Sequence, residues 1–445
     1  MVLYLDNIRG FKEEYIELND VNFLVGENST GKTSLLSILS LFFQRETSSA
    51  GFKNEYVDLG TFDEIRTKNS PNKRNFCVGF ITNKNDILDI AYDAQFLIFK
   101  EEDGYPIIEK ALCFSKKSLL TLNLNDNELN YSLKKQTSAF NIDSIKLIIK
   151  SITKKGYKDV DLRTDTEGTL KSLFFYMGNI DFIRRSPSLL LNELSHLFLF
   201  RNPDERKLFA DFISNRSYST NNVVWFNPIR SHPLPIYQNN RREYSPGGDH
   251  IASTLREIFK SKESNKEIIE SIKEFGRSTG LFDNIAVDSY GDSIDSPIYI
   301  KISLQGKELK IPNVGYGVSQ ILPILVEVVN QSKSAVFLVQ QPEVHLHPKS
   351  QAFCGEFFFK EYVEDKKRFI IETHSDFVID RFRLLIRTSK DKEIHKKINI
   401  LFFESDENGN KVHTISIDKN GNYPDTQPQK FRDFFLQEGL TLLGF

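Results

Sequence analysis

The sequence predicts an α/β fold, with a mixed or mostly parallel sheet flanked by helices and a mostly helical insertion. The last third of the chain alternates apolar strands with helical stretches, as in SQILPILVEVVNQ, SAVFLV and RFIIETHS, and this alternation is typical of parallel sheets covered by helices. Near the N-terminus, the apolar strand VNFLVG runs through a glycine-rich turn into SLLSILSLFF, whose apolar residues recur at helical spacing.

The individual elements divide the chain into three parts. In residues 1–114, VLYLDNI and EEYIEL predict strands joined by a turn at Gly10, and NFCVGFI and AQFLIF predict further strands. Residues 115–222 contain lysine-rich stretches such as DSIKLIIKSITKK and SPSLLLNELSHLFLF, which predict a mostly helical insertion. Residues 223–445 begin with the strand NNVVWF and continue with an amphipathic helical stretch broken once, a hairpin around Gly306 and the alternating segment. We expect both chain ends to form one head, with the insertion as a dimerisation, effector or sensor surface.

Composition excludes several classes of protein. The 445 residues are 40% hydrophobic and 27% charged with a net charge of -2, which is ordinary for a globular protein and does not point to a nucleic-acid binder. The three cysteines lie far apart, which argues against a disulfide scaffold or a zinc module. No apolar run approaches the roughly 20 residues that a membrane span needs. We therefore expect a cytoplasmic protein without a membrane partner.

The strongest motif is GENSTGKT, which fits the phosphate-binding pattern G-x-x-x-x-G-K-[ST] (Walker A) without a mismatch. The two glycines let backbone N–H groups converge on phosphate oxygens, and the following helix adds partial positive charge. Lys32 is expected to contact the β- and γ-phosphates, and the Thr33 hydroxyl to ligate Mg²⁺. The alternative is a glycine-rich turn that only caps a helix. The predicted ATP-binding residues are Gly26, Glu27, Asn28, Ser29, Thr30, Gly31, Lys32, Thr33 and Ser34.

Four segments appear in the order found in ABC-type ATPases: GENSTGKT, VGYGVSQILPIL, LVQQPEVHLHP and IIETHSDFVI. The chain resembles the OLD-like branch of that class, which is akin to SMC-type ATPases. It looks most like the ATPase subunits of bacterial antiphage systems such as Septu (PtuA) and PARIS (AriA). The segments VVWFNPIRSHPLPIY and ISIDKNGNYPDTQPQKF are also similar to that branch. The resemblance implies an ABC-type P-loop ATPase head that uses ATP and Mg²⁺.

The resemblance implies roles for a second loop and for one histidine. The signature loop of the family, which contacts the nucleotide of a partner copy, falls on Gly315, Gly317, Ser319 and Gln320; a glycine turn that starts a helix is the alternative. His374 matches the switch histidine that senses the γ-phosphate. A histidine with a purely structural role at a strand end remains the alternative for His374.

The stretch Gln340-Gln341 departs from the family pattern. Gln340 stands where relatives place the carboxylate that holds Mg²⁺, and Gln341 where many place the catalytic carboxylate. A glutamine cannot take a proton from water at neutral pH and is a weaker Mg²⁺ ligand than a carboxylate. Glu343, two residues on, could serve as the base in a shifted register. We therefore expect slow or absent ATP hydrolysis, with Gln341, Glu343 and His374 as catalytic candidates and Thr33 and Gln340 as metal ligands.

Two further groups of residues have more than one interpretation. His345 and His347 could form a metal pair, although the resemblance places them in a loop that meets the other subunit. Basic residues of the insertion could be a solvated surface or a sensor face for nucleic acid or a phage protein. These basic residues are Lys116, Lys117, Lys134, Lys135, Lys154, Lys155, Lys158, Arg184 and Arg185.

The expected partners follow from the resemblance. ATP bound at Gly26–Ser34 of one copy would meet the Ser319 loop of another, so we expect a head-to-tail homodimer or a larger homo-oligomer. The effector would be a separately encoded nuclease, of HNH or Toprim-like type, and the trigger a nucleic acid or a phage protein. Two rival functions stay open: an SMC-like maintenance ATPase acting on nucleic acid, and a scaffold that nucleotide stabilises permanently.

Overall fold

The computed structural model describes residues 1–43, 52–54, 56–68, 75–82, 93–115, 117–125, 129–154, 157, 166–170, 184–185, 223–238, 243–291, 293, 296–333 and 335–431. The chain forms two compact units, each assembled from separate segments. Unit 1 comprises Met1–Asn19, Glu27–Asn222 and Phe403–Thr414, and unit 2 comprises Asp20–Gly26, Val223–Phe402 and Ile415–Phe445. Within the described ranges, no helix is both long and apolar enough to cross a membrane.

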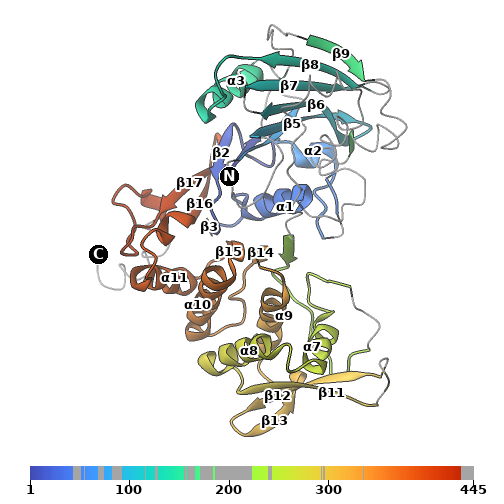
Figure 1. Ribbon diagram of the computed structural model, residues 1–445, viewed down its shortest axis with the longest axis vertical. Helices are drawn as coiled ribbons and strands as arrows, with labels where there is room; N and C mark the ends of the chain where they lie inside the picture. Colours follow the sequence, from blue (N-terminus) through green and yellow to red (C-terminus); the bar gives the residue numbers. More distant parts are fainter. Residues whose placement is uncertain are drawn as a thin grey trace. The chain divides into compact units, whose positions relative to one another are not determined.

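Unit 1 is built on an antiparallel sheet of eight strands in the order β2-β1-β4-β5-β6-β7-β8-β9 (Figure 1). Its core holds large aromatic and aliphatic side chains such as Tyr4, Phe96 and Phe114, against which α3 packs Ile145 and Ile149. The strands are β1 Val2–Asp6, β2 Glu14–Glu17, β4 Phe76–Ile81, β5 Ala94–Glu102, β6 Tyr105–Ser115, β7 Ser118–Leu124, β8 Leu129–Lys135 and β9 Thr166–Leu170. The helices are α1 Lys32–Phe43, α2 Phe62–Ile65 and α3 Ile142–Lys154.

The first part of the predicted helical insertion differs from expectation. Among the described residues of 115–222, β7, β8 and β9 are strands that extend the sheet, and α3 forms the predicted helix over DSIKLIIKSITKK. The reason is visible in β7, where SLLTLNL pairs with β6 on one side and β8 on the other and buries most of its side chains. The predicted helix SPSLLLNELSHLFLF lies outside the described residues.

A second sheet has six strands in the order β10-β14-β15-β3-β16-β17, and its first four strands belong to unit 2. The first four strands of this order run parallel. Every residue of β3 and β14 is buried, which explains the continuous apolar runs VNFLVG and VFLV, because a parallel sheet is covered on both faces. The strands are β3 Val21–Gly26, β10 Val223–Phe226, β14 Val336–Gln340, β15 Arg368–Glu372, β16 Ile398–Asp406 and β17 Gly409–Ser416.

Helices and a small sheet complete unit 2. Helices α10 and α11 pack against each other, and α7 and α8 pack against α9 (Figure 1). An antiparallel sheet of three strands, β11-β12-β13, includes the predicted hairpin with its turn at Gly306. The helices are α7 Ile251–Lys260, α8 Lys266–Thr279, α9 Tyr316–Asn330, α10 Pro348–Asp365 and α11 Asp376–Thr388, with short 3-10 turns at Ile311–Asn313 and Ile394–Lys397. The small strands are β11 Asn284–Ser289, β12 Ile298–Leu304 and β13 Lys307–Lys310.

Candidate functional site

The carboxyl ends of β10, β14, β15 and β3 meet at one edge of the unit 2 sheet, because these strands are parallel neighbours. The chain leaves β3 at Gly26, the first residue of the Walker A motif. Gln340 ends β14 and Glu372 ends β15. Ligands of open parallel sheets bind outside this edge. The strand topology therefore brings the predicted Walker B and switch segments of unit 2 to the functional edge.

The Walker A loop has the backbone geometry that its glycines predict. Gly26 and Gly31 have φ values of +143° and +100°, which L side chains rarely adopt. A Cβ atom at Gly31 would also lie 2.5 Å from the Phe11 ring. Lys32 begins α1 and is buried, and its ammonium group donates a hydrogen bond of 2.6 Å to the Glu27 carbonyl. The lysine is therefore turned toward the loop itself, as phosphate binding requires.

The other predicted residues of this loop lie around the same carbonyl or at the surface. The Thr30 hydroxyl donates to Glu27 O over 2.8 Å. The loop conformation is further fixed by Ser29, whose φ is +64°. Thr33, the predicted magnesium ligand, is exposed, as are Glu27, Asn28 and Ser29, whereas Gly31 and Ser34 are half-buried.

The two amides at the end of β14 make different contacts. The Gln340 amide nitrogen donates to a carboxylate oxygen of Glu372 over 3.2 Å, and both side chains are buried. Gln341 has a left-handed backbone with φ of +43°, and its N–H donates to the carbonyl of Glu372 over 2.8 Å. Glu372 was not singled out by the sequence, because a single acid at the end of a predicted strand carries no spacing signal.

Glu343 lies close to the switch segment. One of its carboxylate oxygens accepts a hydrogen bond of 2.8 Å from the backbone N–H of His374. The other oxygen, Oε2, is buried and has no partner among the described residues. Burial raises the pKa of Glu343, and the His374 N–H opposes this shift only in part. The side chain of His374 itself is exposed at the end of β15. The structure thus brings the two predicted catalytic candidates Glu343 and His374 together.

Arg230 connects the end of β14 to the signature helix. It is 1% exposed, and its guanidinium donates to the carbonyls of Gln340 and Gln341 over 2.8 and 3.2 Å. Its Nε and Nη1 atoms have no partner among the described residues. Burial lowers the pKa of Arg230 to about 10, so it remains a cation at neutral pH. The sequence hinted at this residue only through the family-like segment NPIR.

The predicted signature residues fall at the start of α9. The side-chain amide of Gln320 accepts from Arg230 N over 3.2 Å and donates to Arg230 O over 3.3 Å. The Ser319 hydroxyl donates to Tyr316 O over 2.7 Å. Both Ser319 and Gln320 are buried, whereas Gly315 is exposed. Gln320 therefore anchors α9 within its own protomer, and the exposed part of the loop is its glycine end.

A close contact explains the second glycine of the signature loop. A Cβ atom at Gly317 would lie 2.7 Å from the His345 carbonyl oxygen. Glycine thus lets the first turn of α9 approach the loop that follows β14, so that the signature and Walker B segments are packed together in unit 2.

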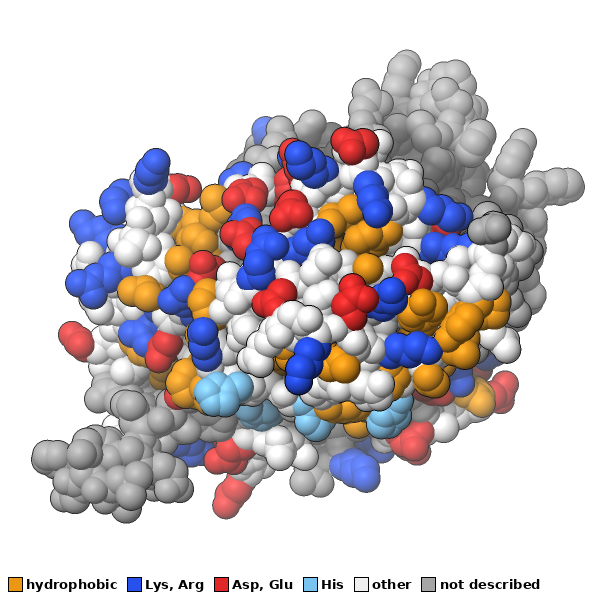
Figure 2. Space-filling view, turned by 90° about the horizontal axis from the view of Figure 1, so that it is seen from below, with side chains coloured by type: hydrophobic (Ala, Val, Ile, Leu, Met, Phe, Trp, Pro, Cys, Tyr) orange, Lys and Arg blue, Asp and Glu red, His pale blue; other side chains and the backbone are white. Residues whose placement is uncertain are grey.

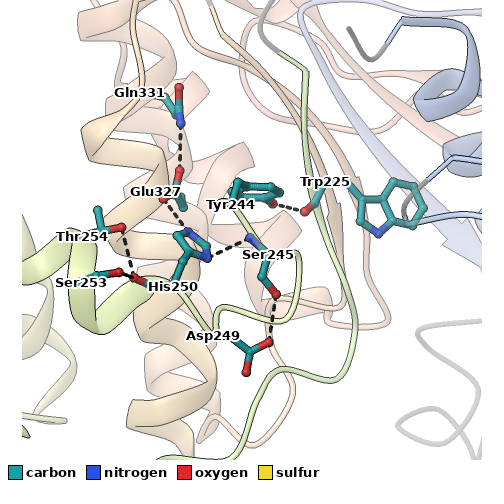
Figure 3. Close-up of polar contacts among 9 residues, drawn as sticks. All are labelled: Trp225, Tyr244, Ser245, Asp249, His250, Ser253, Thr254, Glu327 and Gln331. Atoms are coloured by element: carbon teal, nitrogen blue, oxygen red, sulfur yellow. Dashed lines mark hydrogen bonds and ion pairs between the residues drawn. The ribbon is translucent and has the colours of Figure 1, made fainter. Parts of the chain in front are cut away.

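The opposite half of α9 is held by a buried polar network (Figure 3). Ser245 N–H donates to His250 Nδ1 over 3.0 Å, so the proton of a neutral imidazole lies on Nε2, which contacts Glu327 of α9 at 2.8 Å. Gln331 donates to the other oxygen of Glu327 over 2.9 Å. His250 and Glu327 are each 3% exposed. The network ties the segment before α7 to the signature helix.

His345 and His347 do not form a metal pair with a third ligand, since the described part of the chain contains no group of three or more His, Cys, Asp or Glu side chains placed to hold a metal. His345 packs its ring edge-to-face on Tyr316, at 4.8 Å between centroids. His347 caps α10 by accepting a hydrogen bond from Lys349 N. Both histidines are exposed, and Tyr316 also contacts His232 over 3.2 Å.

Two basic residues of the insertion approach one carboxylate, and one of them, Arg184, is buried. Arg184 is 1% exposed and pairs with Glu102 at 3.0 Å, and Arg185 approaches the same carboxylate at 3.9 Å. Lys116, Lys155 and Lys158 lie outside the described residues. Figure 2 draws a different face, from the side on which Figure 1 places β12 and β13, and there Lys and Arg side chains are interspersed with Asp and Glu.

A phosphate-binding loop between a buried parallel strand and a helix is typical of P-loop nucleotide-binding proteins. A family model described as the AAA ATPase domain (AAA_15) matches residues 1–379, and the chain belongs to this family. The predicted fold class, an α/β ATPase head of the ABC type, is confirmed by this match and by the helix-flanked parallel sheet. Among curated proteins, none matches the chain in sequence.

Several solved structures are similar to the chain in fold. One is an SMC head bound to the C-winged helix domain of ScpA, with 14% identity, a TM-score of 0.45 and coverage of 94% of this chain and 98% of that chain. Another is the SMC head domain from Thermotoga maritima, with 12% identity, a TM-score of 0.36 and coverage of 94% and 98%. A third is the Smc head from Pyrococcus furiosus with an extended coiled coil, bound to the C-terminal domain of ScpA, with 12% identity, a TM-score of 0.39 and coverage of 100% and 98%.

The residues present fit the nucleotide that an ATPase family implies. The left-handed glycines and the buried Lys32 at the start of α1 form the donor set that a triphosphate needs. Gln340 and Glu372 offer oxygen atoms, the ligand type that Mg²⁺ prefers. When bound, Mg²⁺ would neutralise phosphate charge, which is the chemistry it supplies in phosphoryl transfer.

Proposed function

We propose that the chain is an ATP-binding subunit that assembles head to tail around Mg·ATP, as a dimer or larger oligomer, and hydrolyses it slowly or not at all. Assembly would control a separately encoded effector nuclease in antiphage defence. The effector and the defence role rest on the resemblance to Septu and PARIS ATPase subunits. Slow turnover rests on the pair of amides, Gln340 and Gln341, at the end of β14.

The amides matter because neither can accept the proton of an attacking water. General-base catalysis typically contributes about 10²- to 10⁴-fold to a rate. Glu343 is the acid next along the chain, but it is buried and one oxygen is committed to the N–H of His374. Burial also raises the pKa of Glu343 above that of an exposed glutamate. These properties support a nucleotide-bound state that lasts long enough to regulate a partner.

Exposed apolar residues beside the signature helix support assembly of two copies. Ile229 is 77% exposed, Leu234 50% and Ile236 44%. This segment lies along the start of α9, because Arg230 bonds to Gln320 and His232 to Tyr316. Apolar side chains grouped on a surface are typical of protein interfaces. We propose that this segment meets the partner copy when ATP is bound.

Single-turnover measurements with [γ-³²P]ATP and Mg²⁺ test the proposal. We expect wild-type protein to retain ATP and to release phosphate little faster than Lys32→Ala, which should bind no ATP. The control is Lys419→Ala, at an exposed position, which should behave like wild type. Rapid phosphate release that Lys32→Ala abolishes would show that the chain is an active hydrolase instead. Nucleotide that copurifies and never exchanges would favour the permanent scaffold.

A further inference from the structure

We propose that Glu372, at the end of β15, supplies the magnesium-binding carboxylate that Gln340 lacks at the end of β14. The inference rests on the nucleotide binding proposed above and adds a residue to its metal site. In this arrangement the acid stands on the neighbouring strand, so a carboxylate is present at the edge where the parallel strands end.

The strand register places Glu372 on the required face of the sheet. Gln340 and Glu372 are direct partners across β14 and β15, and paired residues of adjacent strands direct their side chains to the same face. The contact of 3.2 Å between the Gln340 amide nitrogen and a Glu372 oxygen confirms that the two side chains meet. The position that relatives give to a magnesium-binding acid is therefore shared here by an amide and a carboxylate.

Glu372 also neighbours the strand that delivers the Walker A loop. On its other side, Glu372 pairs with Leu24 of β3. Two residues after Leu24, β3 ends at Gly26, where the Walker A motif begins. A carboxylate on β15 thus lies between the Walker B strand and the strand that leads to the phosphates.

The chemistry of the pair fits a magnesium ion better than Gln340 alone. A carboxylate can only accept hydrogen bonds, so the Gln340 atom that contacts Glu372 is its nitrogen, and the amide oxygen is the atom left for a metal. Mg²⁺ is commonly bound by one or two carboxylates together with substrate phosphates and water. A site of this kind needs no cluster of three protein ligands, and the described residues contain none.

The other candidate for this role, Glu343, is directed elsewhere. Glu343 follows the end of β14 by three residues, and its carboxylate accepts a hydrogen bond from the backbone N–H of His374. Glu372, in contrast, ends a strand and contacts Gln340 directly. The geometry separates the roles of the two acids, with Glu372 toward the metal and Glu343 toward the switch segment.

The test measures metal binding directly, with the full chain and ATP at a saturating concentration. Mn²⁺ replaces Mg²⁺, and its bound fraction is read by electron paramagnetic resonance. We expect Glu372→Gln to weaken Mn²⁺ binding about 10- to 100-fold, while ATP affinity measured in EDTA stays at the wild-type value. The double variant Q340E/E372Q returns the acid to β14 and should restore Mn²⁺ binding. Glu364→Gln, at an exposed position of α10, is the matched control and should have no effect.

The outcomes separate this inference from the proposed function. Wild-type Mn²⁺ affinity in Glu372→Gln overturns the inference while nucleotide binding stands. Failure of the wild-type chain to bind ATP with or without metal overturns both. If Glu372→Gln does not fold, the Mn²⁺ affinity of Gln340→Glu tests the inference instead. This variant places two carboxylates side by side, and we expect it to bind Mn²⁺ more tightly than wild type. An unchanged Mn²⁺ affinity in Gln340→Glu would contradict the role of Glu372.

Discussion

At the scale of single residues, Glu343 is a carboxylate whose charge the fold disfavours. Burial raises its pKa above the ordinary value, and one of its oxygens has no partner among the described residues. A group whose pKa is raised in the folded state stabilises the fold below its unfolded pKa, about 4.3 for glutamate. That contribution is lost as the pH rises through the folded-state pKa. The wild-type chain therefore carries an electrostatic cost at neutral and alkaline pH.

Glu343→Gln should remove this cost. The amide oxygen can still accept the His374 N–H, but it carries no charge to bury. We expect the melting temperature of the variant, relative to wild type, to rise between pH 4.5 and pH 8, as followed by thermal unfolding. The exposed Glu364→Gln should show a difference that does not depend on pH. A Glu343→Gln difference that stays flat over the same range would contradict the burial argument.

At the scale of elements, the junction between α9 and the strand ends is fixed by few side chains. The amide of Gln320 satisfies both backbone groups of Arg230, and the Arg230 guanidinium satisfies the carbonyls of Gln340 and Gln341. The start of the signature helix and the end of the Walker B strand are thereby joined through one arginine. A shift of α9 would therefore also displace the end of β14.

Gln320→Ala should loosen this junction. It leaves the N–H and C=O of Arg230 unpaired at a buried position, which typically costs about 1–3 kcal/mol. We expect the free energy of unfolding to fall by that amount, measured as a lower midpoint in urea unfolding. Gln331→Ala, which removes an amide contact to Glu327 at the end of the same helix, should cost less. Equal losses in the two variants would argue against a special role for Gln320.

The elements of unit 2 were predictable because their apolar patterns are long and regular. The sequence segments that form β14, β15, α9 and the hairpin at Gly306 all have the secondary structure that was predicted for them. The strands β7 and β8 were missed, since a leucine-rich stretch such as SLLTLNL suits a helix as well as a strand. Their state is decided by pairing with β6, which is a tertiary interaction that a local pattern does not contain.

The candidate site also has a part that the sequence predicts and a part that it does not. The Walker A residues were predictable, because their spacing reflects a fixed backbone shape around a phosphate. The contacts of Glu372 and Arg230 were not, because each depends on strand register or on a partner about 30 to 110 positions away in the chain. The burial of Gln320 was likewise unforeseen: the residue expected to contact a partner copy bonds to its own protomer.

At the scale of the whole molecule, assembly around ATP should depend on the exposed segment beside α9. We predict that Ile229→Glu prevents ATP-dependent dimerisation, because it places a charge where an apolar side chain would be buried between copies. Ile229 is 77% exposed, so the folded monomer should keep its melting temperature and its affinity for ATP. Light scattering after size-exclusion chromatography, with and without Mg·ATP, measures the change in mass.

The matched control for this prediction is Leu147→Glu in α3, where leucine is 68% exposed. It changes a similar apolar side chain to the same acid, so any general effect of charge on solubility appears in both variants. We expect only Ile229→Glu to remain monomeric with Mg·ATP. If both variants dimerise as wild type does, the interface lies elsewhere on the surface. If both fail, the loss reflects added charge rather than position, and the segment beside α9 has no special part in assembly.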